Sequence, residues 1–443
     1  MMTLRDFFEF IEKEDKRLIC FGTGLMAEDA LVYKEIKSRI DFFCDNDKEK
    51  QGRIVNIGTN EYLVRSPHDL EDVDSRRYII LITSGYYQDI RKQIETINPK
   101  FSKFIFDFPV LKVMLASHSE EFFEERILRE CLKEYDMVLD QEGIEEKERN
   151  NLIYKKEKYI RGDGSNNRPF VIPRVMIMPT TRCNLRCKGC SSLLPLFENP
   201  MDVEIDTILK DCDVFFSAVD QCIRLTIGGE PFLYQHLDRI LERLINEPKL
   251  LGIMLITNGM RTPNEELVPL LKDKKVLVEI SDYGMLEQMS RSIGFMEKHG
   301  INFRVLTEQT WTDMGGIEER GREENELKFI YLNCDQSRVI KGMYDGRFYI
   351  CARSARMTAL GVYSSEHDSF ELSDDVSAEQ IRKRLMKMYY CDYADSCDRC
   401  DLGALPTKVM DAGMQINKAI RKSEYTIVKR DEYERLLKKS LIR

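Results

Sequence analysis

The sequence predicts an α/β protein whose central part is a parallel sheet curled into a partial barrel. Between residues 174 and 332, short apolar runs alternate with stretches of helical periodicity, and this alternation is typical of parallel sheets. Polar and glycine-containing motifs follow several of the runs, at the strand ends where barrel active sites lie. A glycine turn before this region and a cysteine-rich stretch after it predict a smaller unit on either side.

Length and composition narrow the class of protein. With 443 residues, the chain is long enough for two or three domains. It has no run of 18 apolar residues and no apolar leader at its start, so we expect a cytoplasmic protein with no membrane partner. Thirteen cysteines in such a chain favour metal binding or catalysis over disulfides. The net charge of −9 and the absence of a basic block argue against a nucleic-acid partner.

Residues 1–115 predict a Rossmann-like α/β domain. Apolar strands are expected at 17–21, 40–45 and 78–82, and a helix at about 28–37. Gly22, Gly24 and Ala27 match G-x-G-x-x-A after the first strand, and Asp45 ends the second. In dinucleotide sites the glycines make a tight turn, the helix N-terminus receives phosphate and the acid holds a ribose. The alternative is that the glycines serve only the packing of strand on helix.

The remaining domain boundaries follow from composition and periodicity. A charged, helix-prone stretch predicts a helical connector over 116–170, closed by the turn-rich run Arg161–Pro169. The barrel is expected over 171–330, a cysteine-rich domain over 331–405 and a helical tail over 406–443. The barrel strands are expected at 174–179, 223–228, 252–257, 276–281, 303–307 and 328–332.

Three cysteines stand close together directly after the first barrel strand. Cys183, Cys187 and Cys190 have the spacing C-x3-C-x2-C. Thiolates bind iron–sulfur clusters, and a cubane normally takes four protein ligands. Three ligands leave one iron open to a substrate or cofactor, which suggests chemistry at that iron. The alternative is a structural zinc site, which often uses histidine, but no histidine lies within 30 residues of these cysteines.

Polar residues end three of the predicted strands. The second strand runs into Gly228, Gly229, Glu230 and Pro231. Glycine allows the backbone to approach a ligand, and a carboxylate accepts hydrogen bonds from an ammonium group. Taken alone, such a run is more often a strand-to-helix turn. The next two strands end in Thr257-Asn258-Gly259 and in Ile280-Ser281-Asp282.

With these motifs the chain resembles the radical S-adenosylmethionine (SAM) superfamily over roughly residues 174–400. The resemblance implies a partial (β/α)6 barrel and a [4Fe-4S] cluster with an open iron, held by Cys183, Cys187 and Cys190. It implies that SAM is held by Gly228, Gly229, Glu230, Pro231, Thr257, Asn258 and Ser281. The family usually has an aromatic residue before the third cysteine, near the adenine. This chain has Gly189 there, so packing against the adenine must be weaker or come from elsewhere.

A second group of cysteines follows the barrel. Cys334 precedes a predicted hairpin over 345–351 that leads into Cys351, and Cys391, Cys397 and Cys400 have the spacing C-x5-C-x2-C. The order resembles the SPASM or twitch extension of radical SAM enzymes, which implies one auxiliary [4Fe-4S] cluster. We expect Cys334, Cys351, Cys397 and Cys400 to hold it, with Cys391 as a free thiol or a replacement for one of them. The alternative is a zinc knuckle. The remaining five cysteines are interpreted as packing residues, namely Cys20, Cys44, Cys131, Cys212 and Cys222.

The resemblance implies an enzyme that cleaves SAM reductively to a 5′-deoxyadenosyl radical, which then takes hydrogen from a substrate. A reductant such as flavodoxin or ferredoxin would supply the electron. Residues 1–115 also resemble domains of sugar- and capsule-pathway proteins, which favours a sugar or nucleotide sugar as substrate; a peptide is the alternative. Two hypotheses from other classes are a non-catalytic iron–sulfur electron carrier and a zinc-stabilised binding module. The electron carrier would not explain the three polar strand ends.

Overall fold

The computed structural model describes residues 4–58, 60–113, 120–141, 144–161, 169–284, 286–307 and 310–416. The chain divides into two compact units. The first comprises residues 1–129, 322–334 and 403–408, and the second comprises 130–321, 335–402 and 409–443. Among the described residues, no helix is long and apolar enough to cross a membrane. The domain boundaries expected from the sequence stay a prediction.

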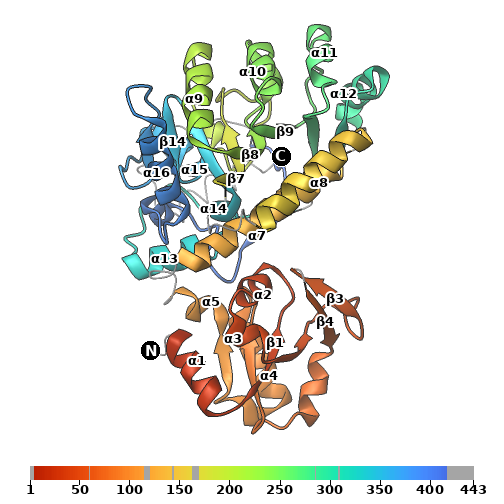
Figure 1. Cartoon of the computed structure of the whole chain (residues 1–443), viewed down its shortest axis with the longest axis vertical. Helices are drawn as coiled ribbons and strands as arrows, with labels where there is room; N and C mark the ends of the chain where they lie inside the picture. Colours follow the sequence, from red (N-terminus) through yellow and green to blue (C-terminus); the bar gives the residue numbers. More distant parts are fainter. Residues whose placement is uncertain are drawn as a thin grey trace. The chain divides into compact units, whose positions relative to one another are not determined.

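The first unit is built on a six-stranded sheet in the order β3-β4-β2-β1-β5-β6 (Figure 1). All neighbours in this sheet are parallel except β3 and β4. The strands are β1 (Arg17–Phe21), β2 (Ile40–Cys44), β3 (Ile54–Ile57), β4 (Asn60–Arg65), β5 (Tyr78–Ile82) and β6 (Ile105–Asp107). The helices are α1 (Leu4–Lys13), α2 (Leu25–Ala30), α3 (Lys34–Lys37), α4 (Tyr87–Ile97), α5 (Phe108–Leu111) and α13 (Glu324–Leu332), with 3-10 turns at Pro67–Asp72 and Pro99–Phe101.

The central strands of this unit are buried on both faces. Leu18 and Cys20 of β1 belong to one apolar cluster, and Ile19 and Phe21 belong to the other. Side chains alternate between the faces of a strand, so the uninterrupted apolar run of β1 serves two cores. The three strands predicted from the sequence here are confirmed as β1, β2 and β5.

The helix expected at 28–37 is instead two short helices, α2 and α3. The break falls at Val32 and Tyr33, and Tyr33 is extended with φ −81° and ψ 114°. β-Branched and aromatic residues are weaker helix formers than Ala or Leu, and Tyr33 also stacks on Phe122. Packing of the ring therefore competes with continuation of the helix.

The second unit is built on an eight-stranded sheet in the order β11-β10-β9-β8-β7-β13-β14-β15. Strands from β11 to β13 are parallel, and β14 and β15 are antiparallel to their neighbours. The strands are β7 (Val171–Ile177), β8 (Gln221–Ile227), β9 (Leu250–Thr257), β10 (Val276–Asp282), β11 (Phe303–Thr307), β13 (Ile340–Tyr344), β14 (Arg347–Tyr349) and β15 (Ser369–Glu371). A separate pair is formed by β12 (Thr310–Thr312) and β16 (Val409–Asp411).

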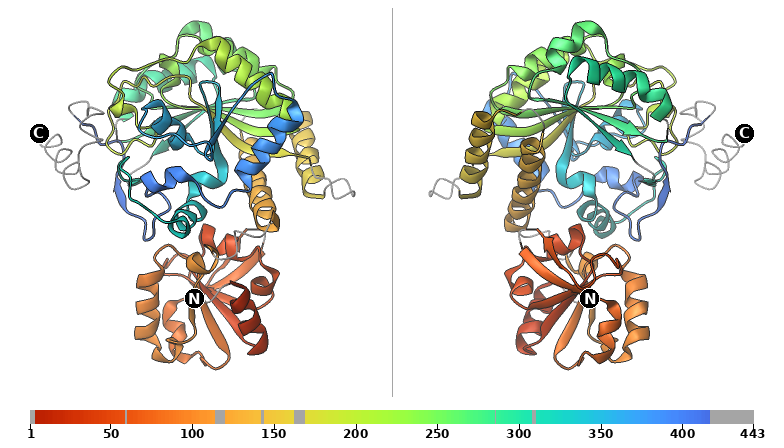
Figure 2. Two further views of the ribbon diagram at one scale, coloured as in Figure 1. Left: turned by 90° about the vertical axis from the view of Figure 1, so that its left-hand side faces the viewer. Right: turned by 90° about the vertical axis from the view of Figure 1, so that its right-hand side faces the viewer.

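Helices arch over one side of this sheet, as the two views in Figure 2 show for α9 to α12. The long helix α7 (Glu120–Leu139) begins in the first unit and ends in the second. The other helices are α8 (Glu146–Arg161), α9 (Ile205–Ala218), α10 (Leu237–Ile245), α11 (Val268–Leu271), α12 (Leu286–His299), α14 (Asp335–Val339), α15 (Ala352–Ala359) and α16 (Ala378–Tyr389). Four 3-10 turns lie at Leu194–Leu196, Pro231–Leu233, Glu265–Leu267 and Asp395–Arg399.

The predicted α/β class with parallel sheets is confirmed, and so are five of the six predicted barrel strands, now β7 to β11. The sixth, expected at 328–332, is wrong because this run lies in helix α13. A short apolar run does not distinguish strand from helix by periodicity. A capping box between Glu323 and Glu326 starts the helix. The sixth parallel strand is β13, which pairs with β7.

The C-terminal residues also differ from expectation. In the predicted helical tail, residues 409–411 form strand β16 instead; residues 417–443 lie outside the described residues. The predicted hairpin over 345–351 is confirmed as the turn between β13 and β14. Its Asp345 and Gly346 have φ of 47° and 77°, the conformation that favours Asp-Gly in tight hairpins.

One buried carboxylate attaches this hairpin to helix α9. Asp211 is 3% exposed, and its side chain accepts a hydrogen bond from the Gly346 N–H at 3.0 Å. Burial raises the pKa of Asp211 to about 7; the Gly346 N–H opposes the shift and the Asp345 charge adds to it. Because the folded state holds this proton more tightly than the unfolded chain, stability falls as the pH rises from about 4 to about 7.

We expect Asp211→Asn to be more stable than the wild type at pH 8, by about 2 kcal/mol, and to lose this advantage near pH 5. The amide oxygen of asparagine can still accept from Gly346 but carries no charge to desolvate. Denaturant unfolding between pH 5 and 8 measures the difference. Asp345→Asn, which removes the neighbouring charge, serves as the control and should change the pH dependence much less. Equal pH dependence of Asp211→Asn and the wild type would contradict the assignment.

Candidate active site

A cavity of about 520 Å³ opens at the carboxyl ends of the parallel strands in the second unit. Nine of the site residues predicted from the sequence line it, namely Cys183, Cys187, Cys190, Gly228, Gly229, Glu230, Thr257, Asn258 and Ser281. Pro231 does not line the cavity; it is buried and begins the 3-10 turn after β8. Because parallel strands end at one edge of the sheet, motifs far apart in the sequence reach one cavity.

The cysteine loop that follows β7 brings three reduced thiols together. Burial, with smaller contributions from Glu230 and the neighbouring thiols, raises the pKa of Cys183 to about 12. Burial and the Cys190 thiol raise the pKa of Cys187 to about 11. The loop folds on itself through the Leu185 N–H, which donates to the Cys183 sulfur at 3.4 Å. Gly189, with φ +70°, makes the turn before Cys190. One of these adjacent thiols is buried and two are half-buried, and a bound cation would favour their deprotonation, so the donor set fits a metal cluster.

Glu230 joins the ends of two strands. Its side chain is fully buried, one carboxylate oxygen accepts from the Thr257 hydroxyl at 2.7 Å, and the other accepts from the Asn258 N–H at 3.0 Å. Burial raises the pKa of Glu230 to about 7 against these hydrogen bonds. Each carboxylate oxygen has a second lone pair, so the group can still accept from a ligand in the cavity. A cationic ligand would lower this pKa.

Two side-chain amides donate toward the cysteine sulfurs. Asn258 approaches Cys183 at 3.5 Å and also donates to the Asn184 side chain at 2.8 Å. Gln415 donates to Cys187 at 3.0 Å. The sequence motifs pointed to Asn258 but gave no signal for Gln415, which lies 228 positions from its partner.

A buried arginine lies behind the third cysteine. Arg356 of α15 has no exposed surface, and one of its terminal nitrogens donates to the Thr180 carbonyl at 2.8 Å. Among the described residues, its Nε and Nη1 atoms have no hydrogen-bond partner. Burial raises the pKa of the Cys190 thiol, and the charges of Arg356 and Arg353 lower it. These arginines therefore favour a thiolate at Cys190.

Side chains from other elements occupy the space beside Gly189, where related sequences usually have an aromatic residue. A Cβ at Gly189 would lie 2.4 Å from the Met410 sulfur, so the thioether occupies that space. Trp311 also lines the cavity, and it packs edge-on against Tyr283 with ring centroids 5.0 Å apart. Asp313 is not among the cavity-lining residues; its side chain accepts from the Gly315 N–H at 2.9 Å.

Three of the four predicted auxiliary ligands lie in the same unit. Cys351 caps helix α15, and its sulfur accepts from the Ser354 N–H. Burial raises the pKa of Cys351, and so does the nearby Cys400 thiol. Cys397 lies in the 3-10 turn that ends at Cys400. Cys334 belongs to the first unit, so its part in an auxiliary site stays a prediction.

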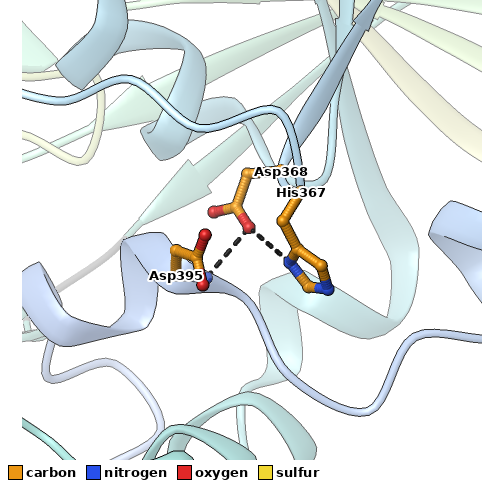
Figure 3. A group of neighbouring side chains, drawn as sticks. All are labelled: His367, Asp368 and Asp395. Atoms are coloured by element: carbon orange, nitrogen blue, oxygen red, sulfur yellow. Dashed lines mark hydrogen bonds and ion pairs between the residues drawn. The ribbon is translucent and has the colours of Figure 1, made fainter.

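Figure 3 shows the group of side chains beside these cysteines, built around Asp368. One oxygen of the carboxylate accepts from the His367 ring at 3.1 Å and from the Asp395 N–H at 2.9 Å. The other accepts from the Tyr363 hydroxyl at 2.6 Å and the Ser396 N–H at 2.8 Å. Burial disfavours the Asp368 charge, but these donors outweigh it and hold the pKa below its usual range. The buried carboxylate therefore anchors the turn that carries Cys397.

Cys391, the fifth cysteine of this region, has its own partners. Its sulfur lies 3.9 Å from the outer ring nitrogen of His367 and contacts the Tyr393 carbonyl. The hydrogen bond to Asp368 and the contact with Cys391 raise the pKa of His367 to about 10. Whether Cys391 replaces another auxiliary ligand stays open. The five cysteines interpreted as packing residues are all buried, as predicted, namely Cys20, Cys44, Cys131, Cys212 and Cys222.

The glycine turn of the first unit is held by Asp45. The Asp45 carboxylate accepts from the Thr23 N–H at 3.1 Å and the Thr23 hydroxyl at 2.5 Å, and its other oxygen accepts from the Asp47 N–H. Gly22 has φ +108°, and a Cβ there would lie 2.8 Å from the Thr83 carbonyl oxygen. Asp45 thus stabilises the turn itself, which supports the packing interpretation of the motif. Binding of a ribose by this carboxylate stays a prediction.

Comparison with known proteins agrees with the barrel motifs. Residues 177–281 match the Radical SAM superfamily. This match agrees with the predicted radical SAM enzyme, in which these residues bind SAM and an iron–sulfur cluster.

Curated relatives match only a short part of the chain. A GTP 3′,8-cyclase of Helicobacter pylori (strain HPAG1) is 33% identical over 91 residues, which cover 20% of this chain and 28% of that protein. A GTP 3′,8-cyclase of Aquifex aeolicus (strain VF5) is 33% identical over 100 residues, covering 21% and 29%. The chain thus spans less than a third of the length of these relatives.

Solved structures show only distant likeness. The protein anSMEcpe with bound AdoMet is 14% identical, with 52% of this chain and 84% of that chain covered and a TM-score of 0.35. BtrN in complex with AdoMet and 2-DOIA is 14% identical, with 52% and 93% covered and a TM-score of 0.33. SuiB of Streptococcus suis bound to its precursor peptide SuiA is 13% identical, with 68% and 88% covered and a TM-score of 0.30. Likeness at this level does not bear on the substrate.

The Asp368 group yields a test of the anchoring role. In Asp368→Asn one acceptor oxygen becomes an amide, which leaves two buried donors without a partner. Each such loss costs on the order of 1–3 kcal/mol. We expect the melting temperature of the cluster-free protein to fall by several degrees, measured by circular dichroism. Asp395→Asn is the control, because the Asp395 carboxylate accepts one hydrogen bond from the Ser365 side chain, against four at Asp368. Equal melting temperatures for Asp368→Asn and Asp395→Asn would contradict the anchoring role.

Proposed function

We propose that this protein is a radical SAM enzyme of the cytoplasm that abstracts hydrogen from a sugar or nucleotide sugar. The observation that carries the proposal is the shared cavity, which is lined by three cysteine thiols and by a buried carboxylate that joins two strand ends. The matched family over residues 177–281 supports the same chemistry. The cavity volume of about 520 Å³ suits a small molecule. The glycine turn at Gly22 and Gly24 motivates the sugar class.

Cys183, Cys187 and Cys190 would hold the cluster, with one iron left open for SAM. The chemistry that the bound cluster supplies is the transfer of one electron to SAM, which then yields methionine and the 5′-deoxyadenosyl radical. Glu230 would accept from the SAM ammonium, while the Gly228-Gly229 backbone allows close approach. Thr257 and Asn258 would hold that carboxylate in place through the hydrogen bonds it already receives. The enclosing strand ends would keep water from the reacting atoms.

The auxiliary site completes the proposal. Cys334, Cys351, Cys397 and Cys400 would hold a second [4Fe-4S] cluster, which passes an electron to or from the substrate or anchors it. Flavodoxin or ferredoxin would supply the first electron. Cys351 caps the N-terminus of α15, and Arg353 and Arg356 of the same helix favour a thiolate at Cys190, which suggests that one helix links the two sites.

Metal and product analysis distinguish the proposed function from its alternatives. After anaerobic reconstitution, we expect iron and acid-labile sulfide rather than zinc. Under reduction with SAM, we expect 5′-deoxyadenosine by mass spectrometry. Zinc without sulfide would favour a binding module, and iron without 5′-deoxyadenosine would favour an electron carrier. A peptide substrate remains the alternative to a sugar, and candidate substrates can be compared by the same product.

Replacing Cys183, Cys187 and Cys190 together by alanine should abolish 5′-deoxyadenosine formation. Bound iron should fall by about four atoms per chain, the content of one cubane, because the auxiliary ligands lie elsewhere in the sequence. Iron analysis and product formation measure both effects. Cys212→Ala is the matched control, since this thiol is buried in α9 and outside the cavity lining. A triple variant that still forms the product would overturn the assignment.

Glu230→Gln should weaken SAM binding about tenfold, because a charge-assisted hydrogen bond contributes about 1.5–3 kcal/mol. Cluster iron should be retained, since Glu230 is not a proposed ligand. Titration of the reconstituted protein with SAM gives the affinity. Glu247→Gln removes a similarly buried carboxylate that pairs with Arg243 outside the cavity, and it should bind SAM as the wild type does. Unchanged affinity in Glu230→Gln would count against its role.

A further inference from the structure

Residues 409–416, here called the strap, connect strand β12 with the cysteine loop of the candidate active site. The strap begins with β16, which pairs antiparallel with β12 so that Met410 lies opposite Trp311. It then reaches the cysteine loop. The Lys188 N–H donates to the Met414 carbonyl at 2.7 Å, and the Ile416 N–H donates to the Arg186 carbonyl at 2.8 Å.

Between these backbone bonds, the side chain of Gln415 contacts the loop twice. Its amide oxygen accepts from the Arg186 N–H at 2.7 Å. Its amide nitrogen donates to the Cys187 sulfur at 3.0 Å and to the Gly413 carbonyl at 2.6 Å. Both ends of the amide are therefore engaged, which fixes its orientation: the N–H points at sulfur and the oxygen at the backbone N–H.

At two glycine positions, the strap lies in close contact with residues of the active site. A Cβ at Gly189 would lie 2.4 Å from the Met410 sulfur, and a Cβ at Gly413 would lie 2.2 Å from the Tyr283 Cβ. Gly413 has φ +65°. Larger side chains at either position would push the strap away from the cavity. Close contact at two separate places indicates that the strap packs as an integral part of the active site.

We propose that Gln415 is a positioning residue of the radical SAM cluster, which donates an N–H···S hydrogen bond to the Cys187 thiolate. The inference rests on the proposed function. Electron transfer to the cluster adds negative charge to the sulfur atoms, and no bond to the protein forms or breaks. A donor at the sulfur stabilises the reduced state more than the oxidised state. Hydrogen bonds to the sulfurs are one of the factors that set cluster potentials, and Gln415 of the strap supplies such a bond.

The test is a redox titration of the anaerobically reconstituted full chain, followed by electron paramagnetic resonance. The signal that changes on addition of SAM identifies the cluster with the open iron. In Gln415→Leu we expect the equilibrium constant for one-electron reduction to fall about tenfold, which is 59 mV for one electron. In Gln415→Glu the added negative charge should lower it further.

Val409→Thr is the matched control on the same strap, because Val409 is 62% exposed and faces no cysteine in the pairing of β16 with β12; it should keep the wild-type potential. A wild-type potential in Gln415→Leu would overturn the proposal. So would an equal fall in Gln415→Leu and Val409→Thr, because the effect would then come from general disturbance of the strap.

A second measurement needs no cluster and therefore separates failure of this inference from failure of the proposed function. Alkylation of the cluster-free chain is followed by peptide mass spectrometry for each cysteine. We expect Cys187 to react about threefold more slowly in Gln415→Leu than in the wild type, because loss of the donor lowers the fraction of reactive thiolate. Cys183, whose amide partner is Asn258, should change little. Unchanged rates at Cys187, or equal slowing at both cysteines, would contradict the contact.

Discussion

The gathering of three thiols, one buried and two half-buried, in one cavity is the constraint on which the rest of the site depends. A thiolate in a low-dielectric setting is unstable unless positive charge or hydrogen-bond donors stabilise it, and burial raises the pKa of all three cysteines. The surrounding elements supply those donors. Asn258 comes from the end of β9, Gln415 from the strap, and the arginines from α15. A metal cluster would complete the neutralisation, since a coordinated thiol is deprotonated outright.

The parallel sheet explains how such distant residues meet. Each strand from β7 to β10 ends at the same edge, and the loop after each strand delivers one polar motif. Glu230 then connects the loops after β8 and β9 by accepting from Thr257 and Asn258. These hydrogen bonds leave the carboxylate buried and fixed, so a ligand would meet a preorganised acceptor. Preorganised groups need little rearrangement on binding.

In the auxiliary region, too, a buried carboxylate holds neighbouring chain segments in place, and here it is that of Asp368. Asp368 accepts four hydrogen bonds from the residues around the cysteine turn, and its own carbonyl accepts from the Ile350 N–H next to Cys351. Asp368 thus ties the two chain segments that carry Cys351 and Cys397, the first through its carbonyl and the second through its carboxylate. Removal of one partner from such a buried network costs more than its formation contributes, because the remaining donors stay desolvated.

The sequence by itself determined the features that local patterns encode. Neighbouring residues alone are enough to recognise the cysteine spacing, the glycine turns and the strand ends. The same holds for the hairpin at Asp345-Gly346, because few residue types other than Asp, Asn and Gly adopt positive φ. The alternation of apolar runs predicted five of the parallel strands. Only the tertiary structure decided that the apolar run at 328–332 is helical, because capping and packing act where periodicity is ambiguous. The contact of Gln415 with Cys187 spans 228 positions, and no local periodicity records a pairing made by packing across the fold.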